Sequence, residues 1–100
     1  MVVVIFRARV KNAEPAYDET GARMRALAFE KYGCLAFHAM ADGDDELAIS
    51  YWPDEDHVAR WRADPAHREA QRVGRERWYA SYAIDVAHVT RSYARDLVDG

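Results

Sequence analysis

One segment near the N-terminus constrains the fold more than any other, because it is apolar on both sides. Residues 2–10 read VVVIFRARV, which is rich in β-branched residues and free of glycine and proline, so the segment predicts a β-strand. Successive side chains of a strand point to opposite faces, which puts Val4 and Phe6 on one face and Val3 on the other. A strand that is apolar on both faces belongs in a sheet whose two sides are both covered.

The rest of the chain predicts helices and strands in a recurring order. Apolar residues at helical spacing, with a proline near the start and a glycine at the end, mark the first helix, and alternating apolar residues mark the later strands. The predicted elements are a helix over about 15–32, hairpin strands over 34–41 and 46–52, two abutting helices within about 55–79, and a last strand over 82–93. The order β-α-β-β-α-α-β is that of an α+β, ferredoxin-like split βαβ fold, in which helices cover one face of a four-stranded antiparallel sheet.

The chain of 100 residues is expected to form a single domain, 1–100. Its ordered core should span about 2–93, and the polar C-terminal tail, 94–100, should fray. Because the helices cover one face of the sheet, the other apolar face is left open. We expect this face to pack against the same face of a second copy, which gives a homodimer through the open sheet face. The alternative is a monomer with an exposed apolar sheet.

Charge and hydropathy exclude several classes of protein. The 14 basic residues are outnumbered by 17 acidic ones, for a net charge of −3, whereas a nucleic-acid-binding protein normally carries a basic stripe. No apolar run approaches the roughly 20 residues that span a bilayer, and the apolar start of the chain is too short for a signal peptide. We therefore expect a cytoplasmic protein that binds neither nucleic acid nor membrane.

Metal and cofactor motifs are absent from the sequence. Cys34 is the only cysteine, so neither an internal disulfide nor a multi-thiol zinc site can form. An acidic run lies at the predicted hairpin tip without the spacing of a calcium loop, and we expect it to be a solvated turn. The run comprises Asp42, Asp44, Asp45 and Glu46. We predict no metal and no cofactor.

The stretch HREAQRVGRERWY at 67–79 places polar residues on one helix face. That face consists of His67, Gln71, Gly74 and Trp78. A polar pair beside an apolar space is what a small-molecule pocket needs, because a few hydrogen-bonding groups orient a mostly apolar ligand. His67 is the leading candidate for a general base, since imidazole exchanges a proton near neutral pH. The alternative is that His67 and Gln71 brace the helices by bonding to backbone or water.

Two further tryptophans bracket the helix that precedes this stretch. Trp52 ends a predicted strand and Trp61 lies one helix later. Large rings of this kind either complete a core or form a flat wall against an aromatic ligand, and the sequence leaves both roles open.

With these segments identified, the chain resembles the antibiotic biosynthesis monooxygenase family. The likeness extends from about Val2 to Tyr93 and rests on SYWPDEDHVARW at 50–61 together with HREAQRVGRERWY at 67–79. Members of that family look like dimeric α+β barrels in which two ferredoxin-like sheets face each other, so the resemblance also implies a homodimer. Known activities include cofactor-free oxidation of polycyclic phenols to quinones with O₂ and, in a related branch, oxidative opening of haem.

The residues of the haem-opening branch carry over only in part. Trp61 stands where that branch has a Trp, but Gln71 stands where it has a haem-ligating His, and Phe6 where it has an Asn. The only Asn of the chain is Asn12, in the predicted loop after the first strand. Haem degradation is therefore not the expected activity. Phenol-oxidising members also use an Asn, so its absence keeps a non-catalytic role open.

The resemblance and the polar helix face together imply a function. We expect a cofactor-independent monooxygenase that oxidises a planar phenolic small molecule with O₂. His67 and Gln71 are the expected catalytic residues, and Trp61, Trp78 and Trp52 are expected to bind the substrate. The alternative is a non-catalytic dimeric small-molecule-binding or accessory protein that uses the same pocket.

Overall fold

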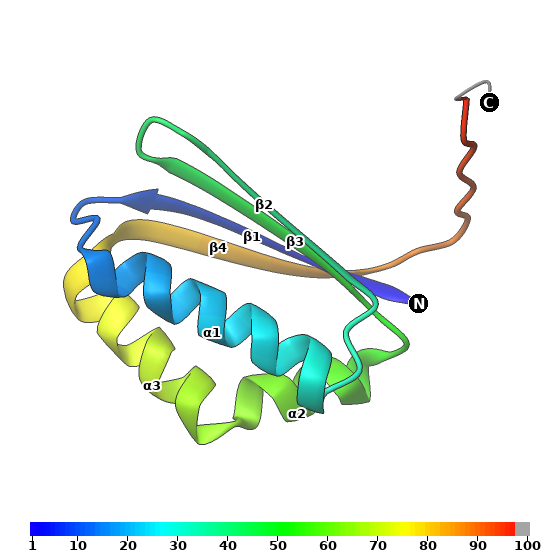
Figure 1. The fold of residues 1–100 in the computed structure, drawn as a ribbon, viewed down its shortest axis with the longest axis horizontal. Coiled ribbons are helices and arrows are strands. Elements are labelled where there is room, and N and C mark those ends of the chain that lie inside the picture. The colour runs from blue at the N-terminus through cyan, green and yellow to red at the C-terminus, as the bar shows by residue number, and fades with distance from the viewer. Residues whose placement is uncertain (98–100) are drawn as a thin grey trace.

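Strands and helices follow one another in the predicted order in the computed structural model, which describes residues 1–97 (Figure 1). The elements are β1 (Val2–Val10), α1 (Pro15–Lys31), β2 (Ala36–Asp42), β3 (Asp45–Trp52), α2 (Glu55–Ala63), α3 (Pro65–Val73), the π-helix η1 (Gly74–Trp78) and β4 (Tyr79–His88). The four strands form one antiparallel sheet in the order β2-β3-β1-β4, and the helices all lie on one side of it (Figure 1). The α+β, ferredoxin-like prediction is confirmed.

The last strand differs from its predicted range of 82–93. It begins at Tyr79 and ends at His88 because it pairs with β1 from Val10 to Val2 and β1 offers no strand beyond that point. Residues 89–97 form neither helix nor strand, and 98–100 of the predicted tail lie outside the described residues. None of the helices in the described part of the chain has the length and apolar character needed to cross a membrane.

The main apolar core lies at one end of the sheet. It joins the start of β1 and the end of β3 to α2 and the last turns of α1. Its buried members are Val2, Val4, Ala28, Cys34, Trp52, Val58 and Trp61. At the other end of β1, Val10 and Trp78 are also buried. The middle of the helix-facing side of the sheet lies between these two packed regions.

A partly buried group of hydrogen bonds, which we call the Tyr32–Asp64 junction, holds the helices to one another. The Tyr32 hydroxyl at the end of α1 donates to Oδ2 of Asp64 at 2.6 Å, while Oδ1 of Asp64 accepts from the Ala66 amide at 2.8 Å and so caps α3. A second bond joins α2 to α1: the Trp61 indole donates to the Met24 carbonyl at 3.1 Å. The direction in which α3 leaves α2 is therefore set by side chains that also hold α1.

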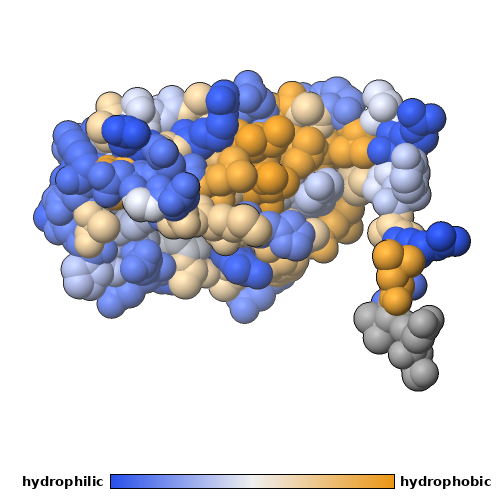
Figure 2. Space-filling view, turned by 90° about the horizontal axis from the view of Figure 1, so that it is seen from above, coloured by the Kyte–Doolittle hydropathy of each residue, from blue (hydrophilic) through white to orange (hydrophobic). Residues whose placement is uncertain are grey.

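The face of the sheet away from the helices is open and partly apolar. Figure 2 looks onto this side and shows an apolar patch bordered by hydrophilic residues. By strand register the patch comprises Val3, Ile5, Met40, Leu47, Ile49 and Tyr51. Two exposed ion pairs stand beside it, Arg7 with Asp85 at 3.3 Å and Arg9 with Asp45 at 3.5 Å. Met40 is 71% exposed, so the described residues leave this face uncovered.

A close approach at Gly74 yields a first prediction. A Cβ at this position would lie 2.5 Å from Cε2 of Tyr79, whose ring is held against Phe6 and Tyr17. We expect Gly74→Ala to lower the free energy of unfolding by about 1–3 kcal/mol, because overpacking outweighs the gain in helix propensity. Gly21→Ala is the matched control, since a Cβ there meets nothing within 4 Å, and it should stabilise by up to about 1 kcal/mol. Urea unfolding of both variants measures the difference, and equal stabilisation would contradict the packing described.

The Tyr32–Asp64 junction yields a pH-dependence prediction. The Tyr32 hydrogen bond, followed by the bond from the Ala66 amide, holds the pKa of Asp64 below its usual value. A carboxyl whose folded pKa is lowered contributes stability above the unfolded pKa of about 3.9, and that contribution is lost as the pH falls through the folded pKa. Tyr32→Phe should therefore be less stable than the wild type at pH 6, and the gap should narrow below about pH 4. Thermal unfolding across pH 3–7 tests this, and a gap that is constant with pH would refute the ionic character of the junction.

Candidate functional site

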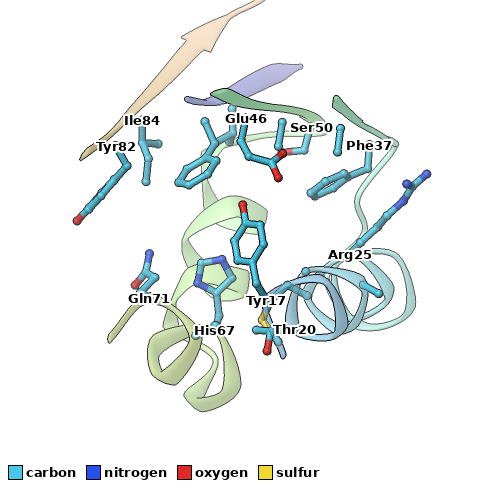
Figure 3. A pocket seen from close by; sticks show the side chains of 18 of the residues that line it. Tyr17, Thr20, Arg25, Phe37, Glu46, Ser50, His67, Gln71, Tyr82 and Ile84 are labelled. Atoms are coloured by element: carbon cyan, nitrogen blue, oxygen red, sulfur yellow. The ribbon is translucent and has the colours of Figure 1, made fainter. Parts of the chain in front are cut away.

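A cavity of about 400 Å³ lies between the helix-facing side of the sheet and the helices α1 and α3. Figure 3 shows its lining side chains converging from the strands above and the helices below. The cavity extends up to the sheet because the side chains on that side are small: Ala39 of β2 lies opposite Ala48 of β3. Larger apolar side chains from β1 and β4, Phe6 and Ile84, continue the same row. The result is a mostly apolar space large enough for a small aromatic molecule.

His67 lies on the helix side of the cavity (Figure 3). Its ring meets the Trp61 ring edge to face, with centroids 4.2 Å apart. Nδ1 is buried and has no hydrogen-bond partner among the described residues, which leaves Nε2 as the nitrogen available to a ligand. Burial, followed by the positive charge of Arg62, lowers the pKa of His67 to about 4, although the Asp64 carboxylate opposes this. The imidazole is therefore neutral at pH 7 and can accept a hydrogen bond or a proton.

Gln71 lies one helical turn after His67 and lines the same cavity. Figure 3 shows the two side chains projecting from α3 toward the sheet. The Gln71 amide makes no hydrogen bond to a described residue, so both its donor and its acceptor remain available. The structure thus brings the predicted polar pair together at the cavity wall.

The three tryptophans occupy different positions. Trp61 and Trp78 line the cavity, and each is held by its indole N–H: Trp61 donates to the Met24 carbonyl and Trp78 donates to Oε1 of Glu14 at 2.9 Å. Trp52 does not line the cavity. It is fully buried behind Trp61, with ring centroids 5.0 Å apart.

Trp52 still reaches the cavity indirectly. Its indole donates to the Ser50 hydroxyl at 2.9 Å, and Ser50 is part of the lining. The strand alternation that buries Trp52 therefore also directs Ser50 toward the same side of the sheet.

The acidic run is expected to be a solvated turn, and for Glu46 this expectation is wrong. Glu46 begins the predicted strand 46–52 and lies in β3, but its side chain is half-buried and lines the cavity, whereas Asp42, Asp44 and Asp45 are exposed. The reason is the alternation of side chains along the strand. Glu46 lies two residues before Ala48, so both side chains point to the helix-facing side of β3, and the acidic composition of the hairpin tip does not reveal this.

Two tyrosines complete the polar side of the cavity, and no pattern in the sequence marks them for this role. Tyr17 extends from the first turn of α1 with its hydroxyl directed toward the sheet and Glu46 (Figure 3). Burial first, and then interactions with Tyr79 and Glu46, raise the pKa of Tyr17 well above its usual value. Burial likewise raises the pKa of Tyr79. Both hydroxyls therefore stay protonated at neutral pH and can donate hydrogen bonds.

Within residues 1–97, no group of three or more histidine, cysteine or acidic side chains is arranged to hold a metal ion. The chemistry on offer in the described cavity is that of a neutral imidazole, an amide, a carboxylate and hydroxyls around an apolar space. Such a set can bind a planar organic molecule by its faces and exchange protons with its polar groups.

Solved structures with the same fold are found among oxygenases and proteins of other descriptions. SnoaB, a cofactor-independent oxygenase from Streptomyces nogalater, superimposes with a TM-score of 0.78 at 16% identity, covering 94% of this chain and 97% of that one. Rv0793 from Mycobacterium tuberculosis gives a TM-score of 0.75 at 16% identity, covering 93% and 98%. At such identities the likeness concerns the fold alone.

Sequence comparisons identify relatives at higher identity. The uncharacterized protein YqjZ of Bacillus subtilis is 36% identical over 89 residues, which are 88% of this chain and 78% of that protein. A jasmonate monooxygenase of Pyricularia oryzae is 39% identical over 46 residues, covering 46% of this chain but only 21% of that protein. The sequence model of the antibiotic biosynthesis monooxygenase family matches residues 1–73, which include β1, the hairpin and the helix that carries His67 and Gln71. On this match, the chain belongs to the antibiotic biosynthesis monooxygenase family.

Proposed function

We propose that the protein is a cofactor-independent monooxygenase that oxidises a planar phenolic small molecule with O₂. The observation that carries the proposal is the pairing of His67 and Gln71 on the wall of an apolar cavity, where Nδ1 of His67 and the Gln71 amide have no hydrogen-bond partner among residues 1–97. Family membership supports a monooxygenase reaction, and the descriptions of SnoaB and of the jasmonate monooxygenase agree with it.

In the proposed reaction, His67 and Gln71 act on the same substrate oxygen. Nε2 of His67 accepts the phenolic proton, and the Gln71 amide N–H donates to the oxygen that becomes negative. The pKa of about 4 describes the empty cavity. A negative charge that forms beside the imidazole raises that pKa, so the ion pair stabilises the transferred proton. Trp61 and Trp78 hold the planar body from the helix side.

The anion then reduces O₂ without help from a cofactor, because the substrate itself supplies the electrons. Its ring carbon bonds to O₂, the imidazolium returns its proton to the peroxide, and loss of water leaves a carbonyl. One oxygen atom ends in the quinone and the other in water. That water takes one hydrogen from the phenolic hydroxyl, carried by the imidazolium, and one from the oxidised ring carbon, so the reaction balances.

The proposal includes a homodimer formed through the open sheet face. The apolar patch around Ile49 supports it, and the ion pairs of Arg7 and Arg9 beside the patch leave little net charge to oppose a second copy. Two such faces can pack about 10 Å apart, as sheets do in sandwiches.

The assembly prediction is a solution mass of twice the 11.5 kDa of one chain at micromolar concentration, measured by light scattering. Ile49→Lys should shift the mass toward one chain, because it puts an unpaired charge in the centre of the interface. Ala26→Lys, on an exposed position of α1, is the control for the added charge and should leave the mass unchanged. A wild-type protein that scatters as one chain would contradict the dimer.

The catalytic prediction concerns His67. His67→Ala should reduce O₂ uptake with anthrone, whose enol tautomer carries the phenolic hydroxyl, by at least about 100-fold, the lower end of what a general base contributes. His88→Ala, an exposed histidine on β4, should retain wild-type uptake. The melting temperature should change by only a few degrees, since Nδ1 of the removed ring makes no hydrogen bond to a described residue. A large loss of stability with unchanged uptake would make His67 a structural brace instead.

A second function is favoured by one observation, the position of the only asparagine. Asn12 lies in the loop after β1 and does not line the cavity, whereas phenol-oxidising members of the family use an Asn. This favours a non-catalytic dimeric binding or accessory protein. Saturable quenching of tryptophan fluorescence by anthrones and hydroquinones, with no O₂ uptake from any of them, would select this alternative.

A further inference from the structure

Glu46 is the acidic residue that the cavity holds on its sheet side. Along the strands, its helix-facing neighbours are small: Ala8 of β1 lies opposite it on one side and Ala41 of β2 on the other. No salt bridge joins Glu46 to a described residue. Glu46 is half-buried and lines the cavity, and without a salt bridge its carboxylate oxygens have hydrogen-bond acceptor capacity that a ligand can use.

Tyr17 stands next to this carboxylate. Its hydroxyl crosses from α1 toward Glu46, while His67 and Gln71 lie on the opposite, helix side of the cavity (Figure 3). Tyr17 can donate one hydrogen bond, and the two oxygens of Glu46 accept several, so the pair has acceptor capacity left over. The cavity therefore has two polar ends with an apolar middle.

We propose that Glu46 and Tyr17 form a subsite for a second hydroxyl group of the substrate, across the cavity from the reacting oxygen. A hydroxyl suits the pair because it can lie between the two groups, donating to the Glu46 carboxylate and accepting the one hydrogen bond that Tyr17 otherwise directs at Glu46. The inference rests on the proposed function and narrows it: the preferred substrate is a polyhydroxylated planar aromatic rather than a singly substituted one.

A cationic ligand group fits this end less well than a hydroxyl. Arg25 and Arg62 line the same cavity and balance the charges of Asp18 and Glu46, so the lining as a whole does not attract a cation. A charged amine would also lose its hydration on entering an apolar space, whereas a hydroxyl loses far less. The carboxylate therefore selects a neutral hydrogen-bond donor.

Binding under anaerobic conditions, followed by quenching of tryptophan fluorescence, tests the subsite without turnover. The probes are anthrone, its monohydroxylated isomers, and the matching methoxy compounds. The wild type should bind at least one hydroxylated isomer about 10-fold or more tightly than anthrone, and the methoxy group, which cannot donate, should abolish that preference. This part of the test needs no variant.

Substitutions at Glu46 and Tyr17 test whether these two residues cause the preference for the hydroxylated ligand. Glu46→Gln and Tyr17→Phe should each reduce the hydroxyl preference to less than about 3-fold. Asp45→Asn is the matched control, because Asp45 is the neighbouring carboxylate on the other face of β3, paired with Arg9, and it should keep the full preference. The measured ratio between two ligands is insensitive to a general loss of stability, which a purely structural role would produce.

The outcomes separate the subsite from the proposed function. Equal affinity for anthrone and every hydroxylated isomer, or an undiminished preference in Glu46→Gln, would overturn the subsite even if O₂ uptake with anthrone proceeds. Absence of both binding and O₂ uptake with every probe would overturn the proposed function and the subsite with it. Uptake together with a preference lost in Glu46→Gln supports both.

Discussion

The central position of β1 is the constraint on which the rest of the structure depends. β1 pairs with β3 from Val2 to Arg9 and with β4 from Val2 to Val10, so its backbone is bonded on both sides by segments that come from far along the chain. Its side chains are apolar on both faces. The helices therefore collect on one face, and the other face is left with an exposed apolar patch. The limits of β4 are set by the same strand.

The cavity follows from how unevenly the helix-facing side is filled. Tryptophans pack both ends, and each indole N–H in these layers finds an acceptor, which fixes the rings. Between these two ends, the small side chains of Ala39 and Ala48 leave space above the sheet unfilled. The cavity walls next to the polar groups are thus held in place by hydrogen-bonded tryptophan rings. A site with fixed walls can hold a small molecule in one orientation.

The sequence predicted the parts of this design that depend on local pattern. The order of elements and the shared face of His67 and Gln71 follow from alternation and helical spacing, and both are found in the structure. The roles of Trp52 and Trp61 could not be told apart, because which of two neighbouring rings faces the cavity is decided by packing between α2 and β3. Glu46 was missed because the acidic tip hides its register, and Tyr17 because a tyrosine in a first helical turn carries no mark of what it will face.

The π-helix between α3 and β4 limits insertions and deletions in this part of the chain. Gly74–Trp78 passes directly into Tyr79, with no loop to absorb a change, and both Trp78 and Tyr79 line the cavity. Deleting one residue here would turn Trp78 by about 100° around the helix axis. It would also exchange the two faces of β4, so that Tyr82 and Ile84 would leave the cavity and Ala83 and Asp85 would enter it. Among related chains, the spacing from His67 to Ile84 should therefore be far more constant than the residues that fill it.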